Sequence, residues 1–175
     1  MELRIANHSD IPVLADLIEN SGRALSAGFY SPRQADAIVR HVFGVDTQLV
    51  DDGTYLLIDD GERIAACGGW SKRRTLFGGD QTKSGADPLL DPATDPARIR
   101  AFFVHPAMAR RGLARQLLAA CTTAARQAGF SSLELAATLP GEPFYLASGF
   151  AVVERFELQL PENVQVPLSR MRLAI

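Results

Sequence analysis

Two arginines and a glycine stand directly before an apolar helical pattern in residues 109–121 (ARRGLARQLLAAC). The first turn of a helix leaves backbone N–H groups without partners, and these groups and the helix dipole favour an anion. Gly112 has no Cβ that would keep a ligand away from the backbone. The side chains of Arg110, Arg111 and Arg115 add positive charge that suits a phosphate. The stretch therefore indicates an anion cradle, with an ordinary basic surface turn as the alternative.

Tyr145 is the second residue whose type suggests chemistry, and it lies in residues 140–150 (PGEPFYLASGF). A phenol can act as a general acid and protonate a leaving group. A thiolate is a suitable leaving group, because a free thiol has a pKa of about 8.5 and a phenol one of about 10. The alternative is a core tyrosine whose hydroxyl reaches the surface.

Composition and motifs exclude several other classes of function. The chain of 175 residues has a net charge of −2, 47% hydrophobic and 22% charged residues, as expected of one soluble globular domain over 1–175. Nucleic-acid binders are usually basic, and no apolar run approaches the roughly 20 residues that span a bilayer. Neither nucleic acid nor a membrane is therefore an expected partner. The GxxxxGK[ST] and GxGxxG phosphate motifs are absent.

The cysteines and the first residues indicate a reducing, cytoplasmic location. Cys67 and Cys121 stand in apolar surroundings without CxxC or Cys/His spacing, so we expect buried small side chains and no metal site. Residues 1–10 (MELRIANHSD) lack the basic start and apolar run of a secretory signal.

Hydrophobic periodicity and capping residues predict alternating strands and helices. Ser31 is a predicted N-cap with Pro32 behind it, and residues 71–97 form a long irregular connection rich in Gly, Pro and Asp. Strands are predicted at 2–6, 54–59, 63–70, 98–106, 131–137, 150–158 and 169–175. Helices are predicted at 11–22, at 31–44 and after residue 109 with Gly129 just past the end, and a short helix within 140–150 ends at Gly149.

The predicted order of elements implies a mixed sheet with helices on its faces. The first strand, at 2–6, is of the edge type, and the two strands at 54–70 form an antiparallel hairpin. The strand–helix–strand unit from 98 to 137 favours parallel pairing with a right-handed crossover. The near-continuous apolar strand at 98–106 is expected at the centre, so the basic turn after it lies where such folds place ligands.

Two segments together resemble the GNAT superfamily of N-acetyltransferases. They are FFVHPAMARRGLARQLL (102–118) and, after a strand, PFYLASGF (143–150). The family pattern is a strand ending in V-x-P, an R/Q-x-x-G-x-G/A loop opening a helix, and a later Y-x-x-x-G-F. Arg111 matches the first loop position, whereas Ala114 and Gln116 depart from the two later ones. The resemblance covers nearly the whole chain, apart from residues 71–97, which look like an insertion.

The resemblance implies an α/β fold of the α+β type, with a mixed, mostly antiparallel sheet of six to seven strands that splay at the cofactor site. It implies acetyl-CoA as co-substrate and no metal. The amine attacks the thioester, the N–H of Val104 polarises the carbonyl and Tyr145 protonates the departing thiolate. Implied cofactor-binding residues are Phe103, Val104, Arg111, Gly112, Leu113, Ala114, Arg115 and Gln116.

Several roles stay open at this stage. The candidates for the general base are His105, Glu142 and a carboxylate from the hairpin or the long loop. Two of them have structural alternatives: His105 as a histidine bonded at the end of a strand, and Glu142 as a charge at the N-terminus of a helix. Trp70, Phe29 and Tyr30 line an acceptor pocket or belong to the core. The leading expectation is N-acetylation of a small amine. The alternatives are a non-catalytic acyl-CoA sensor and a protein lysine or N-terminal acetyltransferase. An exposed edge at 169–175 suggests a homodimer.

Overall fold

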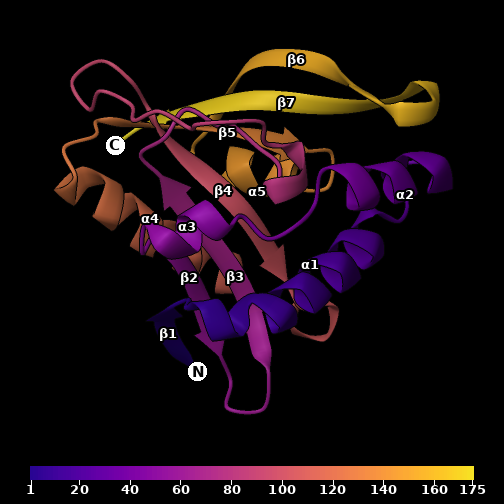
Figure 1. Cartoon of the computed structure of the whole chain (residues 1–175), viewed down its shortest axis with the longest axis horizontal. Helices are drawn as coiled ribbons and strands as arrows, with labels where there is room; N and C mark the ends of the chain where they lie inside the picture. The colour runs from indigo at the N-terminus through magenta and orange to yellow at the C-terminus, as the bar shows by residue number, and fades with distance from the viewer.

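The computed structural model describes all residues, 1–175, and contains one seven-stranded sheet with the order β1-β2-β3-β4-β5-β7-β6 (Figure 1). All neighbouring strands are antiparallel except β4 and β5. The strands are β1 (Glu2–Ile5), β2 (Tyr55–Asp59), β3 (Ile64–Ser71), β4 (Ala97–Val104), β5 (Ser132–Thr138), β6 (Ala151–Leu160) and β7 (Val164–Ala174). The fold class predicted from the resemblance is confirmed.

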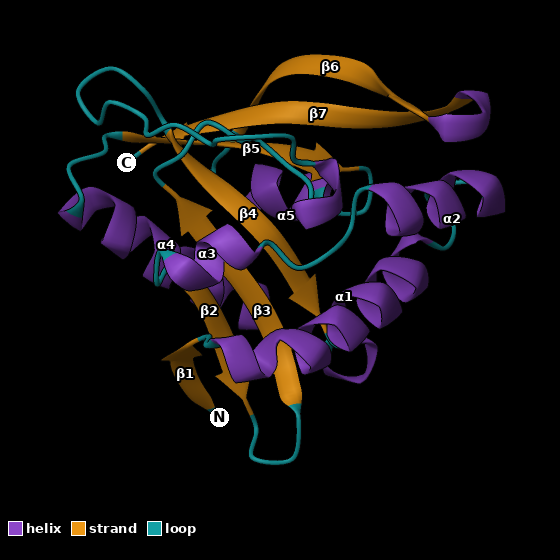
Figure 2. Ribbon diagram, in the orientation of Figure 1, coloured by secondary structure: helices purple, strands orange, loops and turns teal.

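Helices cover both faces of this sheet (Figure 2). One face carries α1, α3 and, over β6 and β7, α2, and the opposite face carries α4 and α5. The helices are α1 (Ile11–Ser26), α2 (Pro32–His41), α3 (Thr47–Asp51), α4 (Leu113–Gln127) and α5 (Glu142–Ala147). No helix is long and apolar enough to cross a membrane.

Two expectations about the elements were wrong, and one helix was missed. α1 does not end near Gly22 but continues to Ser26, because Gly22 packs against Phe43, whose ring leaves no room for a Cβ. The short helix α3 was not predicted. The C-terminal strand is not an edge: β7 begins at Val164 and lies between β5 and β6, so β6 is the edge strand at that end of the sheet and β1 the one at the other end.

β4 and β5 are paired only at their first residues and then diverge. Their register contains two pairs, Ala97 with Leu133 and Arg98 with Glu134. The buried Glu134 accepts a 2.8 Å hydrogen bond from Arg98, and Arg172 of β7 donates to its second oxygen at 2.5 Å. This ion pair holds the base of the splay, and the carboxyl half of β4 is left without a partner strand on that side.

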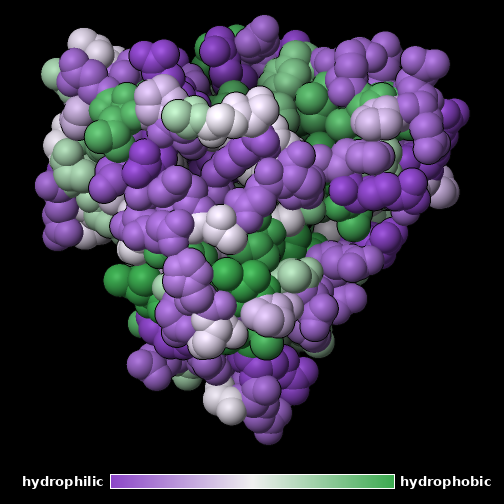
Figure 3. All heavy atoms as spheres, in the orientation of Figure 1, coloured by the Kyte–Doolittle hydropathy of each residue, from purple (hydrophilic) through white to green (hydrophobic).

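Residues 71–97, which we expect to be an insertion, form the long irregular connection predicted between β3 and β4. β3 extends into it as far as Ser71, Arg73 forms an isolated bridge with Leu89, and a single 3-10 turn covers Asp80–Thr82. Residues 75–83 lie on the face that carries α1–α3, whereas Leu90 packs into the core cluster beneath α4. On the α1–α3 face hydrophilic residues predominate, and apolar side chains gather between α3 and α1 (Figure 3).

Candidate active site

The N-terminus of α4 is left open by its own chain. Gly112 is the N-cap residue with φ = 81°, in the left-handed region that favours glycine, and no side chain caps the helix. The backbone N–H groups of residues 110–115 donate no hydrogen bond within the protein. The N–H of Gln116 does donate, to the carbonyl of Gly112 at 3.0 Å, so Gln116 is not one of the free donors. Six consecutive amides are thus available to an external acceptor.

The surroundings of these amides are open and positively charged. A Cβ added at Gly112 would meet no atom within 4 Å. The side chains of Arg110, Arg111 and Arg115 form no ion pair or hydrogen bond, although most other arginines in the chain are paired. Arg110 itself adopts a positive φ of 62°, an uncommon conformation for a residue with a Cβ. The loop has the properties of an anion-binding turn.

A β-bulge redirects β4 just before this loop. Ala101 and Phe102 together lie opposite Gly68, and Ala101 has φ = 55°. Gly68 is required there, because a Cβ would come within 2.6 Å of the Phe102 ring. Sequence analysis missed this bulge, since an alanine gives no turn signal.

The bulge sets the direction of the backbone groups that follow. The N–H of His105 donates to Ala65 of β3 at 2.9 Å. Because successive amides of a strand point to opposite sides, the N–H of Val104 faces away from β3, toward the opening that β5 leaves. Phe103 and Val104 are half-buried, although β4 is the central strand. An extended ligand can therefore lie along this side of β4.

Tyr145 lies on α5, on the same side of the sheet as α4. Its side chain is buried against Phe102, Phe144 and Phe150, with ring centroids 6.4, 5.0 and 5.5 Å away. Its hydroxyl makes no hydrogen bond within the chain, yet it is not among the side-chain atoms sealed from solvent. Burial raises the pKa of Tyr145 well above that of a free phenol, with a smaller contribution from nearby Cys121. The phenol is therefore protonated at neutral pH.

The two named candidate bases are both engaged. Glu142, in the first turn of α5, receives two hydrogen bonds from Arg155 at 2.6 and 2.7 Å and one from the Ser169 hydroxyl. Arg155 and then Ser169 hold the pKa of Glu142 below its usual value. The Nδ1 atom of His105 accepts the N–H of Ala107 at 3.2 Å, which leaves the ring proton on Nε2. The contacts of Glu142 fit a helix-terminal charge, and His105 at the end of β4 accepts a loop N–H and donates to no loop carbonyl.

The aromatic residues suggested for an acceptor pocket have different surroundings. Trp70 is buried in the core against Phe130, with the rings edge to face at 6.2 Å. Phe29 is exposed. The hydroxyl of buried Tyr30 donates to the carbonyl of Pro167 at 2.8 Å and accepts the N–H of Leu139 at 2.9 Å. Tyr30 thus ties the α1–α2 connection to the end of β5, and burial raises its pKa to about 12.

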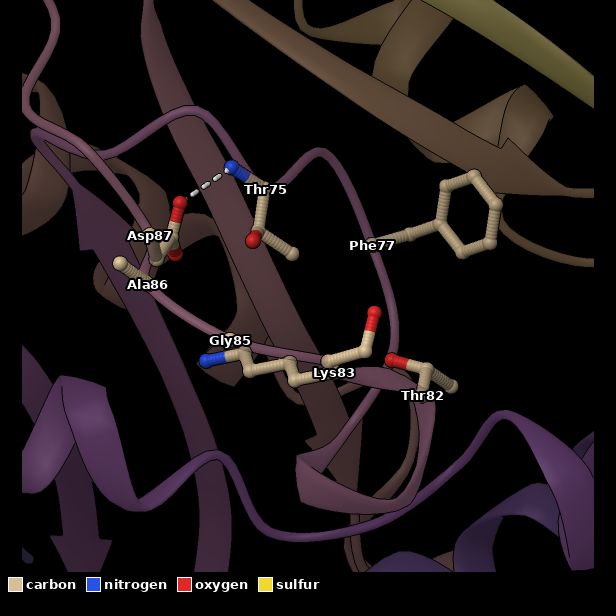
Figure 4. Close-up of a pocket in the computed structure, with 8 residues that line it drawn as sticks. Thr75, Phe77, Thr82, Lys83, Gly85, Ala86 and Asp87 are labelled. Atoms are coloured by element: carbon tan, nitrogen blue, oxygen red, sulfur yellow. Dashed lines mark hydrogen bonds between the residues drawn. The ribbon is translucent and has the colours of Figure 1, made fainter.

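The insertion contains a cavity of its own, with a volume of about 260 Å³ (Figure 4). The carboxylate of Asp87 accepts the N–H of Thr75 at 2.9 Å across one end of it, and the ring of Phe77 points away from Asp87 and Lys83 (Figure 4). Its lining residues are Thr75, Phe77, Thr82, Lys83, Ser84, Gly85, Ala86 and Asp87. Hydroxyl and charged groups predominate, and the cavity lies on the face opposite Tyr145.

Comparison with solved structures shows the same fold in several bacterial and archaeal proteins. A GCN5-related N-acetyltransferase from Rhodopseudomonas palustris has a TM-score of 0.72 at 18% identity, with 99% of this chain and 95% of that chain covered. PaiA N-acetyltransferase from Thermoplasma acidophilum, in complex with coenzyme A, has a TM-score of 0.66 at 12% identity, with 99% of this chain and 98% of that chain covered. YncA from Salmonella typhimurium, with its cofactor acetyl-CoA, has a TM-score of 0.62 at 17% identity, with 99% of this chain and 93% of that chain covered.

No curated protein sequence matches the chain. The model of the Acetyltransferase (GNAT) family matches residues 23–150, which contain the splayed strands, the open helix N-terminus and Tyr145. That range covers well over half of the chain and both segments on which the resemblance rests. The chain belongs to the GNAT acetyltransferase family.

Proposed function

We propose that the protein is an acetyl-CoA-dependent N-acetyltransferase that acetylates a primary amine of a small molecule by direct attack. The observation that carries the proposal is the run of six unbonded amides, 110–115, at the N-terminus of α4. A pyrophosphate is an anion rich in acceptor oxygens, and free amides at a helix N-terminus bind such groups well. The open side of Gly112 leaves room for it.

The chain's own residues have distinct tasks in this proposal. Acetyl-CoA supplies the acyl group as a thioester. The amides of Arg111–Arg115 hold its pyrophosphate, and Phe103 and Val104 hold its arm along the free side of β4. The N–H of Val104 is oriented toward that space and can stabilise negative charge on a carbonyl oxygen. Holding both reactants in one place supplies much of the acceleration.

Tyr145 is the proposed general acid, because its hydroxyl carries a proton and has no partner in the chain. A pKa raised by burial keeps this proton in place throughout the physiological range. A free thiol has a pKa of about 8.5, below that of the phenol. Proton transfer from Tyr145 to the departing thiolate therefore requires the hydrogen bond between the phenol and the sulfur to strengthen as negative charge develops on the sulfur.

The pH dependence follows from the same groups. Glu142 and His105 are already bonded, so we propose that the amine enters in its neutral form. Activity at low acceptor concentration should then rise from pH 6 to pH 9, as more of the amine loses its proton. Because the pKa of Tyr145 is raised, its deprotonation should cause no decline in that range. A decline below pH 9 in kcat/KM, with the protein still folded, would contradict this assignment.

Substitution of the phenol tests the mechanism directly. Tyr145→Phe removes only a hydroxyl that has no partner, so the fold should persist while kcat for CoA release falls about 100-fold. The measurement is thiol release with a panel of amines, and unchanged acetyl-CoA affinity is the control. Binding with no turnover on any amine, and no response to this substitution, would favour the acyl-CoA sensor.

Ligand binding is tested by thermal unfolding. At 100 times its Kd, acetyl-CoA should add about 2.7 kcal/mol to the free energy of unfolding, because it binds the folded state preferentially. The melting temperature should therefore rise with acetyl-CoA concentration. An unchanged melting temperature at millimolar acetyl-CoA would contradict the proposed site.

Location and assembly complete the proposal. Cys67 and Cys121 are buried free thiols, which fits a reducing compartment, so we propose the cytoplasm. The free outer edge of β6 is the proposed place for a homodimer. Sedimentation of the protein, compared with that of a variant carrying proline within β6, tests the assembly.

A further inference from the structure

Residues 75–81 of the insertion, called the strap below, are fixed at several points to other elements. The guanidinium of buried Arg100 on β4 donates to the carbonyls of Thr75 and Gly78 at 3.1 and 2.6 Å. The Phe77 ring lies 6.2 Å from that of Phe156 on β6. The strap is thus attached to two strands that are not neighbours in the sheet.

The far end of the strap is attached to the segment between α2 and α3. The N–H of Gly79 donates to the carbonyl of Val42 at 2.9 Å, and the side-chain amide of Gln81 donates to the carbonyl of Phe43 at 2.8 Å. Lys83, just beyond, forms an ion pair with buried Asp46, which also pairs with Arg100 at 2.8 Å. These contacts place the strap on the face opposite α4 and α5.

Sheet order shows what the strap crosses. β5 and β7 lie between β4 and β6, so a segment bonded to Arg100 and packed on Phe156 passes over both. Arg100 is two residues past Arg98, the last residue of β4 that pairs with β5. Phe156 is in register with Leu168, which pairs with Thr138 at the end of β5. The strap therefore runs from the base of the splay to the tip of β5 (Figure 1).

The side chains around this crossing are mainly aromatic and aliphatic. Phe43 and Phe103 meet edge to face at 5.0 Å on the β4 side, and half-buried Leu139 follows β5 with its N–H held by Tyr30. Phe77 of the strap faces the same side and is half-buried. Phe43, Phe77 and Leu139 pack against the same apolar cluster, so a ligand bound among them would contact apolar side chains.

The charged side chains that β4, β5, β6 and β7 contribute to this crossing are paired. Arg100 is paired with Asp46, Arg98 with Glu134, and Arg170 of β7 with Glu154 of β6 at 3.3 Å. A polycationic acceptor would therefore find no free carboxylate among them. Recognition is left to the apolar side chains, where contact area determines affinity.

We propose that the strap closes the acceptor side of the splay and that Phe77 selects small amines with an apolar, aromatic body. This inference rests on the proposed N-acetyltransferase function and specifies its substrate class. The acceptor enters opposite Tyr145, between β4 and the tip of β5, with its body against Phe77 and Phe103. A strap tied at both ends excludes the flat surface of a folded protein and admits a molecule of a few rings at most.

The experiment compares acceptors on the full-length protein at saturating acetyl-CoA. The probes are 2-phenylethylamine, n-butylamine, spermidine and a lysine-containing peptide. We expect kcat/KM for 2-phenylethylamine to exceed that for spermidine and the peptide at least tenfold. Phe77→Ala should lower this value about tenfold by raising KM for the acceptor, while KM for acetyl-CoA stays unchanged.

Two further variants separate selection from folding. Phe77→Leu keeps apolar packing on Phe156 and should recover part of the activity on 2-phenylethylamine. Leu89→Ala, on the same insertion but with a side chain 59% exposed, should change no constant. Preference for spermidine or the peptide, or an equal loss on all amines in Phe77→Ala, would overturn the strap's role but leave acetyl transfer standing. Turnover on no amine would overturn the proposed function and this inference with it.

Discussion

The N-terminus of α2 is capped by side chains, whereas the N-terminus of α4 is not. In α2 the Ser31 hydroxyl accepts the N–H of Gln34 at 3.2 Å, and the Gln34 side chain accepts the N–H of Ser31 at 3.0 Å. Pro32 at the first helical position has no N–H to satisfy. In α4 the corresponding position is Gly112, which offers no side chain, and the amides around it are unbonded.

The difference separates a helix end that stabilises the fold from one that is available to a ligand. A capping side chain satisfies orphan amides and contributes about 1 kcal/mol to stability. An uncapped end forgoes that contribution, and its amides stay bonded to water until an anion replaces it. The two ends also differ in charge, because unpaired Arg110 and Arg111 precede α4. Stability at α2 and ligand affinity at α4 should therefore respond to different substitutions.

The largest effect on CoA affinity is expected when a methyl group is added at the uncapped N-terminus of α4. Gly112→Ala places a Cβ where φ is 81°, on the side that faces the proposed pyrophosphate. The Kd for CoA, measured by calorimetry, should rise about 30-fold, since one hydrogen bond to a charged group is worth about 2 kcal/mol.

Gly129→Ala is the matched control, because it sits at the other end of α4 with φ = 93°. Both variants should lose about 1 kcal/mol of stability from the strained conformation, but only the first should lose affinity. Equal affinities for CoA in the two variants would mean that the open end is not the pyrophosphate site.

A smaller effect is expected from reversing one charge beside the same end. Arg111→Glu should raise the Kd for CoA about tenfold, because a carboxylate then repels the pyrophosphate across a few ångströms of solvent. The effect should weaken at high salt and should exceed that of Tyr145→Phe. Arg126→Glu, in the last turn of α4, is the control and should leave affinity unchanged. A larger loss of affinity in Tyr145→Phe would mean that the pyrophosphate lies elsewhere.

Local signals in the sequence were sufficient for much of this comparison. Ser31 followed by Pro32 predicted the cap of α2, and the glycine and arginines at 110–112 predicted an uncapped, basic start for α4. Such features depend on neighbouring residues in the chain, so that a pattern over a few positions specifies them. The order of strands and helices, apart from the short helix α3, was predicted for the same reason.

Features that depend on distant contacts were not predictable. Gly22 signalled a helix end, but packing against Phe43 keeps it inside α1. The C-terminal strand at 169–175 was expected to be an exposed edge, yet β7 pairs with strands on both sides. The bulge at Ala101 depends on Gly68 of the neighbouring strand. In each case the contact that determines the local structure is with a residue far away in the sequence. Such packing overrides the intrinsic helix and strand propensities of the residues.

The smallest effect is expected at the capped N-terminus of α2, where a substitution should change only the free energy of unfolding. Ser31→Ala removes the hydroxyl that accepts the N–H of Gln34, leaving that amide to water, and should lower the free energy of unfolding by about 1 kcal/mol. Urea unfolding measures the loss. Ser31→Asp is the conservative control, since its carboxylate can accept the same N–H and suits the positive end of the helix dipole. CoA affinity should be unchanged in both variants, because the amides of α4 are untouched. A change in CoA affinity in Ser31→Ala would show that α2, and with it the acceptor face, is coupled to the cofactor side.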